Sequence, residues 1–250
     1  MSPDLSQDNT DVAVSIVVPV RNEAGNIAPL IAEIAAALDG RWAYEIVYVN
    51  DGSTDATAER LVEARAQRSN VREIRHAESR GQSAAVRSGV RAARGAIVAT
   101  LDGDGQNDPA DIPRLLSALR ADNTGKVGLV GGVRVNRQDA SNRRLASTFA
   151  NGFRRWMLKD TALDSGCGLR VFRREAYLAL PYFDHMHRFL IALVLREGYE
   201  VREIPVNHRA RTHGISKYNN LHRALVGVVD TLGVRWLQSR ARGRVEPEEI

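Results

Sequence analysis

The sequence predicts an α/β fold with a mostly parallel central sheet and helices on both faces. Short runs of apolar, β-branched residues alternate with segments in which apolar residues recur at helical spacing. Several of these runs end abruptly in polar residues, as residues 96–101 do at Asp102-Gly103-Asp104. This alternation of strands and helices implies right-handed βαβ units, and therefore parallel strands.

The individual elements follow from the same two patterns. Strands are expected at residues 12–20, 44–49, 71–74, 96–101, 127–133 and 201–206, with a further strand or turn within 163–172. Helices are expected at residues 27–38, 54–66, 82–90, 112–119 and 189–195. Asn26 and Asp108 stand where helix caps are expected, and Pro109 suits a first helical position.

Length and composition predict one large core, since 44% of the 250 residues are hydrophobic. The single cysteine, Cys167, excludes an internal disulfide framework and is expected to be a small buried residue. A net charge of +5 suits an anionic partner such as a nucleotide, a phosphate or a membrane surface. Solvated surface charge explains the same number equally well.

Three regions are expected along the chain. Residues 1–11 are acidic and polar, so they are interpreted as a flexible N-terminal arm rather than a signal or transit peptide. Residues 12–218 form the main domain, and residues 219–250 form an amphipathic helix and a polar tail. The longest apolar runs fall well short of the ~20 residues that span a bilayer. A soluble or peripheral protein is therefore expected.

Acidic residues follow three of the predicted strands, as Glu23, Asp51, and Asp102 with Asp104. Carboxyl ends of parallel strands meet at one edge of a sheet, where ligands of open α/β folds bind. With Gln106 nearby, the last pair suits a hard divalent cation that also holds a substrate diphosphate. The alternative is a polar turn that leads into a capped helix.

Asp51 suits a nucleoside ligand, because an acid at such a strand end can accept from a base N–H or a ribose hydroxyl. A turn with a helix cap is the alternative for residues 51–54. The sequence has neither a Gly-x-Gly-x-x-Gly motif nor a Walker motif, so it supports neither a dinucleotide fold nor a P-loop ATPase.

The second half of the main domain is basic. Arg134 and Arg143 are interpreted as phosphate ligands, because guanidinium groups match phosphate oxygens. Arg154 and Arg155 flank Trp156 and are expected at a lipid or solvent surface. A basic loop at 208–218 is expected to fold over bound phosphates, with a plain exposed loop as the alternative.

The C-terminal helix is expected over residues 219–242. Its apolar residues recur at helical spacing, and they are Leu221, Leu225, Val228, Val229, Leu232 and Trp236. Several Arg residues accompany them, so the helix suits the headgroup region of an anionic membrane. Packing of the apolar stripe on the core or on a partner subunit is the alternative.

Five separated motifs, in their order along the chain, resemble those of the family 2 glycosyltransferases of the A-type fold. They read VVPVRNE, VNDGSTD, LDGDGQNDP, DSGCGLRVFRRE and RARTHGISKY. The resemblance runs from about Val14 to Tyr218. It is strongest to polyprenyl-phosphate sugar transferases of the dolichol-phosphate mannosyltransferase type.

This resemblance implies the nucleotide-diphospho-sugar transferase fold and a role for each matching position. The nucleoside pocket would be lined by Pro19, Arg21, Glu23, Val49 and Asp51, and the donor would also contact Gly103. Mg²⁺ or Mn²⁺ would be held by Asp102, Asp104 and Gln106. The acceptor phosphate would be bound by Arg134, Arg143 and Ser147. Arg211 and Lys217 would close over the donor diphosphate, and they complete the expected catalytic set with Asp102 and Asp104.

The implied reaction is an inverting, metal-dependent transfer of a mannose- or glucose-type sugar from a GDP- or UDP-sugar to a polyprenyl phosphate. A phosphate acceptor is already anionic at pH 7, so it requires no general base. The implied place is the cytoplasmic face of a membrane, reached by peripheral contact or through a membrane-protein partner. No nucleic-acid partner is expected, because the basic residues lack interleaved aromatics and the helices lack helix-turn-helix punctuation.

Two other functions remain open on the sequence. One keeps the fold and the donor but uses a saccharide hydroxyl as the acceptor, which would require a general base. The other is a non-catalytic nucleotide-binding module that uses the basic half of the chain.

Overall fold

A computed structural model describes residues 12–135, 152, 154–160, 162–210 and 220–241, with backbone alone for 220–225. Seven strands form one sheet in the order β3-β2-β1-β4-β6-β5-β7. They are β1 (Val14–Val20), β2 (Tyr44–Asp51), β3 (Val71–His76), β4 (Ile97–Thr100), β5 (Val127–Arg134), β6 (Arg170–Arg173) and β7 (Glu200–Val206). Only β6 is antiparallel to its neighbours, β4 and β5. The predicted mostly parallel sheet is confirmed.

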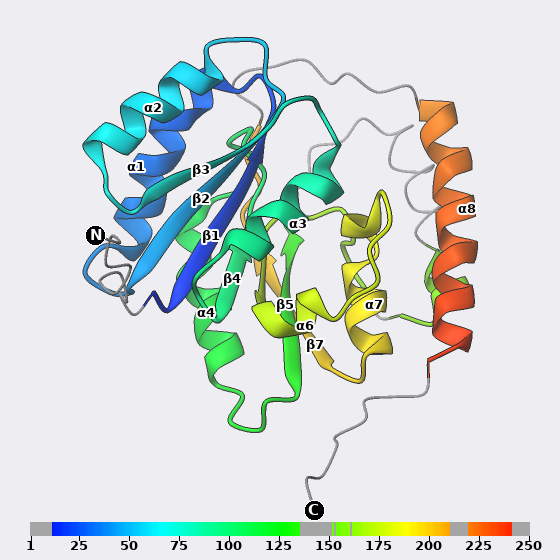
Figure 1. The fold of residues 1–250 in the computed structure, drawn as a ribbon. Coiled ribbons are helices and arrows are strands. Elements are labelled where there is room, and N and C mark those ends of the chain that lie inside the picture. The colour runs from blue at the N-terminus through cyan, green and yellow to red at the C-terminus, as the bar shows by residue number, and fades with distance from the viewer. Residues whose placement is uncertain (1–11, 136–151, 153, 161, 211–219, 242–250) are drawn as a thin grey trace, which may run out of the picture.

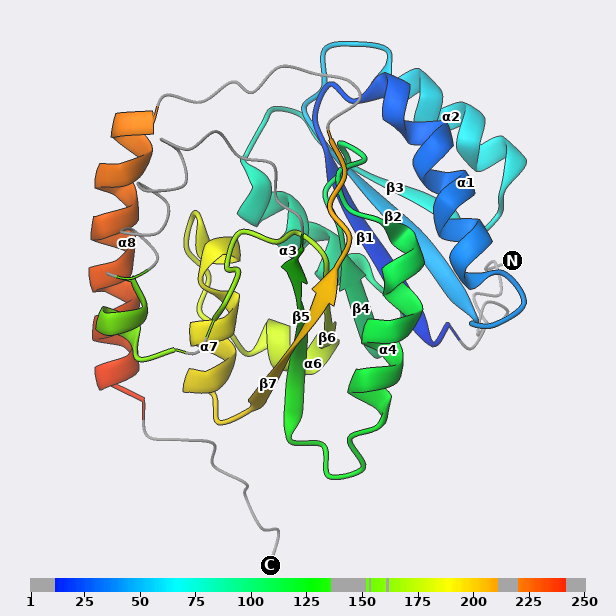
Figure 2. The same ribbon diagram turned by 180° about the vertical axis from the view of Figure 1, so that it is seen from behind.

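Helices cover both faces of this sheet, as predicted (Figures 1 and 2). One face carries α1 (Ile27–Leu38), α2 (Thr57–Gln67) and α4 (Ile112–Arg120). The other face carries α3 (Gln82–Ala92), α6 (Arg174–Leu178) and α7 (Leu190–Arg196). Short 3-10 turns span Ala24–Asn26, Pro109–Asp111 and Met186–Arg188, and α8 (Asn220–Ser239) packs beside α7.

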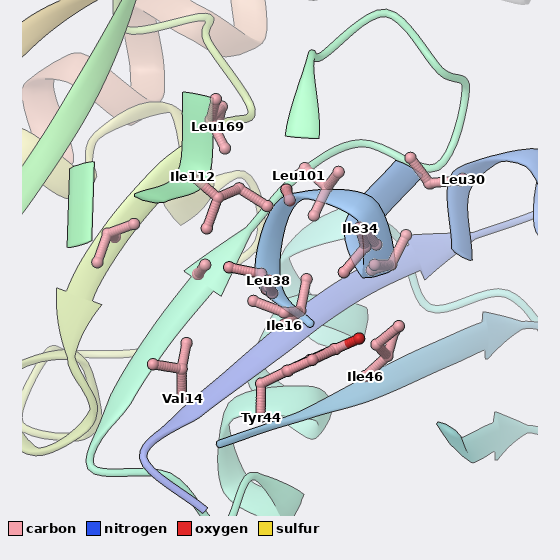
Figure 3. Close-up of a cluster of buried hydrophobic side chains, with 14 of the residues drawn as sticks. Val14, Ile16, Leu30, Ile34, Leu38, Tyr44, Ile46, Leu101, Ile112 and Leu169 are labelled. Carbon is pink, nitrogen blue, oxygen red and sulfur yellow. The ribbon is translucent and has the colours of Figure 1, made fainter. Parts of the chain in front are cut away.

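Two hydrophobic clusters, one on each face, hold the layers together. Figure 3 shows part of the first, in which α1, with Leu30, Ile34 and Leu38, lies over β1, the strand that carries Val14 and Ile16. The second lies under α3 and α7 on the opposite face. Because the strands are buried on both faces, they are continuous apolar runs, and their polar residues are confined to the ends.

The predicted helix caps were correct in one case and wrong in another. The carboxylate of Asp108 accepts from the backbone N–H of Ala110 at 3.0 Å, as a cap should. Asn26 precedes α1, but its side-chain amide donates to Glu23 at 2.6 Å instead of capping the helix. At the start of α2 it is Asp55, rather than Asp51, that accepts from the backbone N–H of Thr57.

The prediction of a surface position was wrong for Arg154. This side chain is buried and pairs with Asp160 at 2.6 Å, in a position where both groups are almost fully covered. A buried cation needs such a partner, because an unpaired charge inside a protein is costly. Arg155 and Trp156 are exposed, as expected.

Helix α8 contacts the domain with one side and leaves another open. Val234 is buried, and with Leu237 it packs against the second hydrophobic cluster. The members of the predicted stripe whose side chains are described are all exposed, and they are Val228, Val229, Leu232 and Trp236. Within the described part of the chain, no helix is long and apolar enough to cross a membrane.

Candidate active site at the carboxyl edge of the sheet

The turn after β4 places Asp102 and Asp104 at the carboxyl edge of the sheet. The N–H of Asp102 donates to the side-chain oxygen of Asn107 at 2.9 Å, and the N–H of Gln106 donates to Asp104 at 3.1 Å. A Cβ atom on Gly103 would lie 2.4 Å from the side chain of Val20. Only glycine therefore allows the turn to lie this close to the end of β1.

The two carboxylates interact unfavourably with each other. Burial, reinforced by the negative charge of Asp104, raises the pKa of Asp102 to about 6. The guanidinium groups of Arg170 and Arg134 act in the opposite direction, and Gln82 donates its side-chain amide to Asp102 at 2.8 Å. The site is thus an acidic pair whose repulsion the protein only partly offsets.

The oxygen atoms of Asp102, Asp104 and Gln106 fit a divalent cation whose other ligands are water and substrate phosphates. Among the residues that the structure describes, no cluster of three His, Cys, Asp or Glu side chains is placed to hold a metal. Two carboxylates with the nearby amide of Gln106 suit Mg²⁺ or Mn²⁺, because Mg²⁺ usually binds one or two carboxylates together with water and substrate phosphates.

A cavity of about 150 Å³ opens beside Asp102. Its walls come from the ends of β1 and β4, the start of α3, the 165–168 loop and the turn before α7. They include Pro19, Gln82, Asp102, Ser165, Gly166, Cys167, Gly168, Arg170, His187 and Arg188. A Cβ atom on Gly168 would lie 2.3 Å from the Asp102 carboxylate, so the loop needs glycine at this position. Cys167 is fully buried as predicted, and burial raises the pKa of its thiol to about 11.

Asp51 is committed to internal hydrogen bonds rather than left open for a nucleoside. Its Oδ1 accepts from the N–H of Arg80 at 2.8 Å and lies 2.7 Å from Nδ1 of His76. Its Oδ2 accepts from the hydroxyl of Ser79 at 2.7 Å and the N–H of Gly81 at 2.9 Å. The carboxylate thus fixes the loop between β3 and α3, which neither predicted role for Asp51 had anticipated.

The other residues expected at the nucleoside pocket differ in burial and position. Pro19 lines the cavity, whereas the side chain of Val49 is fully buried in the second hydrophobic cluster, so only its backbone can face a ligand. Arg21 is exposed, and Glu23 is half-buried. Hydrogen bonds do join the loops after β1 and β2, where Thr54 N–H donates to the Asn22 side chain at 2.8 Å.

Arg134, expected to bind the acceptor phosphate, forms a bidentate ion pair with Asp164. Its Nε donates to Oδ2 at 2.6 Å, and its NH2 nitrogen donates to Oδ1 at 2.8 Å. Burial works to lower the pKa of Arg134, but Asp164 outweighs it and raises the pKa. Arg143, Ser147, Arg211 and Lys217 lie outside the described residues.

The segment that leads into Arg211 is anchored beside the acidic turn. His208 forms a β-bridge with Asn107, and the N–H of Arg209 donates to the carbonyl of Gln106 at 2.9 Å. The guanidinium of Arg209 pairs with Asp108 at 2.6 Å and with Glu33 at 2.7 Å. These contacts place residues 208–210, the first part of the predicted phosphate-closing loop, beside the acidic turn.

Four residues at the cavity were missed by sequence reasoning: Gln82, Arg170, His187 and Arg188. Gln82 stands in the polar stretch that leads into α3. Arg170 lies in the segment for which a strand or turn is expected, and no element is expected at His187 and Arg188. Their convergence depends on the antiparallel β6 and on the turn Met186–Arg188, for which the hydrophobic pattern carries no signal.

Comparison with known proteins identifies the family. The model of glycosyl transferase family 2 matches residues 15–180. A dodecaprenyl-phosphate galacturonate synthase of Rhizobium johnstonii is 36% identical over 231 residues, 88% of this chain and 66% of that protein. An undecaprenyl-phosphate 4-deoxy-4-formamido-L-arabinose transferase of Edwardsiella ictaluri is 38% identical over 241 residues, 93% of this chain and 73% of that protein. The chain thus spans about two thirds to three quarters of these relatives.

Solved structures show the same fold at low sequence identity. Glucosyl-3-phosphoglycerate synthase from Mycobacterium tuberculosis, in complex with Mn²⁺, UDP and glucosyl-3-phosphoglycerate, matches with a TM-score of 0.66 and 21% identity, over 94% of this chain and 81% of that one. Mannosyltransferase PcManGT from Pyrobaculum calidifontis, in complex with GDP-Man and Mn²⁺, matches with a TM-score of 0.64 and 22% identity, over 94% of this chain and 66% of that one. The A-type glycosyltransferase fold is therefore confirmed, and this chain belongs to glycosyl transferase family 2.

Proposed function

We propose that this chain transfers a sugar from a nucleotide-sugar donor to a polyprenyl phosphate, with a divalent cation and with inversion at the anomeric carbon. The two relatives are polyprenyl-phosphate sugar transferases, one for galacturonate and one for formamido-arabinose. The nucleotide, the sugar and the polyprenyl chain are left open by the proposal, and the mannose- or glucose-type sugar expected from the sequence is one candidate among several.

One observation carries the proposal. Among the described residues that line the cavity, Asp102 is the single carboxylate, and it belongs to the metal-binding pair. Asp164 lies nearby, but both of its oxygens accept from Arg134. A saccharide hydroxyl would need a general base to remove its proton, whereas a phosphate monoester attacks as an anion. The site is therefore better suited to a phosphate acceptor.

The proposed roles follow from these positions. A divalent cation held by Asp102, Asp104 and Gln106 would neutralise the charge that develops on the leaving nucleoside diphosphate. Gln82 donates to Asp102, and the anchored Arg209 directly precedes the segment in which Arg211 and Lys217 are expected to bind the same phosphates. The acceptor phosphate attacks the anomeric carbon on the face opposite the leaving group, which gives inversion.

A panel assay tests this function directly. The chain is incubated with GDP- and UDP-sugars and a short polyprenyl phosphate, with Mn²⁺ or with EDTA, and the lipid products are identified by mass spectrometry. We expect one sugar to appear on the lipid phosphate, and only when the metal is present. Nucleotide binding without any transfer across the panel would favour the non-catalytic binding module.

His187 separates the two acceptor classes. Its imidazole is the other described side chain on the cavity wall that could serve as a general base, and its Nδ1 lies 2.7 Å from the hydroxyl of Ser83. His187→Gln should leave transfer to a prenyl phosphate within about tenfold of the parent rate, because no base is required. A loss of 10³-fold or more, together with activity on saccharide acceptors, would support a hydroxyl acceptor instead.

We also propose that α8 brings the enzyme to the membrane surface that holds its lipid substrate. Its outer side exposes Val228, Val229, Leu232 and Trp236, and Arg235 lies on the same helix. Such a helix binds the headgroup region of anionic membranes through apolar burial and positive charge. This supports a membrane-proximal location.

Flotation with anionic liposomes, at low and high salt, tests the role of α8. Val229→Glu combined with Leu232→Glu should abolish flotation, since both side chains are exposed and their replacement leaves the core intact. Val62→Glu is the matched control, because Val62 is also exposed but lies on α2. Equal flotation of all three proteins would exclude α8 as the anchor.

A further inference from the structure

The cavity beside Asp102 carries more positive than negative charge. Its described walls present two guanidinium groups, Arg170 and Arg188, and a single carboxylate, Asp102. Once a divalent cation neutralises Asp102 and Asp104, the excess positive charge of this cavity increases. Guanidinium groups in a recess of this kind bind phosphate and carboxylate groups.

Arg170 holds two walls of the cavity together. Its side chain is 5% exposed, and it donates to the carbonyl of Ser165 and to the carbonyl of His187, each at 2.6 Å. One of these carbonyls lies in the 165–168 loop and the other in the turn Met186–Arg188. The turn is fixed further by Ser83, whose hydroxyl accepts from the N–H of His187 at 3.2 Å. The turn that carries Arg188 is therefore fixed by two side chains, Arg170 and Ser83.

The same turn connects the cavity to α8. Nδ1 of His185 lies 3.2 Å from the carboxylate of Asp230 on α8, and Arg188 interacts electrostatically with the same carboxylate. Arg188 thus lies between the cavity and the helix whose outer side is apolar. A phosphate carried on a lipid would reach the cavity from this direction if α8 lies on the membrane.

The donor diphosphate and its cation are expected at the acidic turn. Gln106 belongs to this turn and accepts from the N–H of the anchored Arg209, and neither residue lines the cavity. In an inverting transfer, the attacking and leaving groups lie on opposite faces of the sugar. The nucleophile is therefore expected on the cavity side of the anomeric carbon.

We infer that this cavity is the subsite for the acceptor phosphate, with Arg188 as its ligand and Arg170 as the positioning residue that joins its walls. This inference rests on the proposed function for the identity of the acceptor. The subsite is argued from described residues alone, which come from β6 and from the turn before α7.

The test compares Arg188→Gln with the parent enzyme, using farnesyl phosphate as a soluble acceptor. We expect the KM for farnesyl phosphate to rise about 10- to 100-fold, because a charge-assisted bond to one substrate is lost. The KM for the nucleotide sugar should not change. Arg188→Lys should recover part of the affinity, and Arg41→Gln, which removes an exposed charge elsewhere, should have no effect.

Direct binding makes the test independent of transfer. Calorimetry with farnesyl phosphate should give weaker binding to Arg188→Gln than to the parent, and inorganic phosphate should compete in the parent protein. Farnesol, which lacks the phosphate, should bind both proteins alike. If no nucleotide sugar supports transfer, the proposed function fails, while this comparison still decides the inference.

Two results would overturn the assignment. One is a rise in the KM of the nucleotide sugar with an unchanged acceptor KM, which would give the cavity to the donor. The other is unchanged binding of both ligands. If Arg188→Gln loses its native circular dichroism, Arg188→Met replaces it, and farnesyl phosphate binding by that variant equal to that of the parent would also overturn the inference.

Discussion

Asp51 ends β2 and Asp102 follows β4, both at the carboxyl edge of the sheet, yet the pKa values of their carboxyl groups are shifted in opposite directions. Burial works to raise the pKa of Asp51, but hydrogen bonds from Arg80, His76, Ser79 and Gly81 outweigh it, so the pKa lies below its usual value. Asp102 is half-buried and lies near another carboxylate, and both effects raise its pKa, to about 6. Both acids follow apolar strands, and the strand pattern does not distinguish them.

The difference separates an acid that stabilises the fold from an acid that awaits a ligand. A carboxylate surrounded by internal donors keeps its charge and orders the groups that donate to it. A carboxylate left beside another negative charge is stabilised when an external cation arrives. On this basis we expect Asp51 to position the loop before α3 and Asp102 to belong to the reaction site.

The largest expected effect is on activity at the acidic pair. Asp104→Ala should reduce transfer on the order of 10³-fold or more, since a metal that stabilises the leaving diphosphate contributes several kcal/mol. The measurement is kcat/KM with saturating Mn²⁺, with the melting temperature as a check on folding. Asp39→Asn, at an exposed acid directly after the C-terminal end of α1, is the control. Full activity of the parent in EDTA would contradict this role.

The next effect is on stability at Asp51. Asp51→Asn should lower the free energy of unfolding by about 2 kcal/mol, because an amide offers one acceptor oxygen where four donors require two. The loss should depend on pH in a defined direction. A carboxylate with a lowered pKa stabilises the fold above its unfolded value near 4, and this contribution disappears as the pH falls through the lower folded value.

Urea unfolding at several pH values measures the effect. The two proteins should differ most near pH 7 and should converge below about pH 4. Ser79→Ala, which removes one donor and leaves the carboxylate, should cost less. A variant with parent stability at pH 7 would refute the positioning role and return Asp51 to the nucleoside pocket.

A smaller effect of opposite sign is expected at Asp102. Asp102→Asn should raise the unfolding free energy of the metal-free protein at neutral pH by on the order of 1 kcal/mol, after allowance for partial exposure. A raised pKa means that the charged form destabilises the fold. The penalty grows as the pH rises from about 4 to about 6 and is constant above that range.

Urea unfolding in EDTA checks this sign, and activity with Mn²⁺ should be lost in the same variant. A destabilised Asp102→Asn protein in EDTA would show that Asp102, like Asp51, is a structural acid. The contrast between the two residues would then fail.

The fold and the position of the acidic pair could be predicted from the sequence because both follow from local patterns. Buried parallel strands are continuous apolar runs, and Asp102-Gly103-Asp104 directly follows such a run. The antiparallel β6 could not be predicted in the same way, because a strand of four residues has too short a pattern to show its direction. The position of Arg170 in the cavity wall depends on β6, so it could not be predicted either.

The partners of charged side chains were equally hidden. Arg134 meets Asp164 across thirty residues of chain, and Asp51 meets the loop at Ser79 to Gly81 across a similar span. A motif identifies which residue types stand near a site, but long-range pairing decides which of them remain open to a ligand. Hence the sequence predicts a ligand for both Asp51 and Asp102, whereas in the structure Asp51 is surrounded by internal hydrogen-bond donors and Asp102 is not.

The smallest expected effect concerns Gln82, which connects the two acids. The Asp51 carboxylate fixes Gly81 through its N–H at 2.9 Å, and the next residue, Gln82, donates to Asp102 at 2.8 Å. Gln82→Ala should reduce kcat only about three- to tenfold, because one exposed hydrogen bond to a carboxylate is lost and both carboxylates remain. Asp51→Asn should lower kcat through the same contact. The double variant should then lose less than the product of the two single effects. Steady-state kinetics of the four proteins measure this coupling. Independent, multiplicative losses would mean that Asp51 acts on the reaction by another route, such as direct contact with the donor.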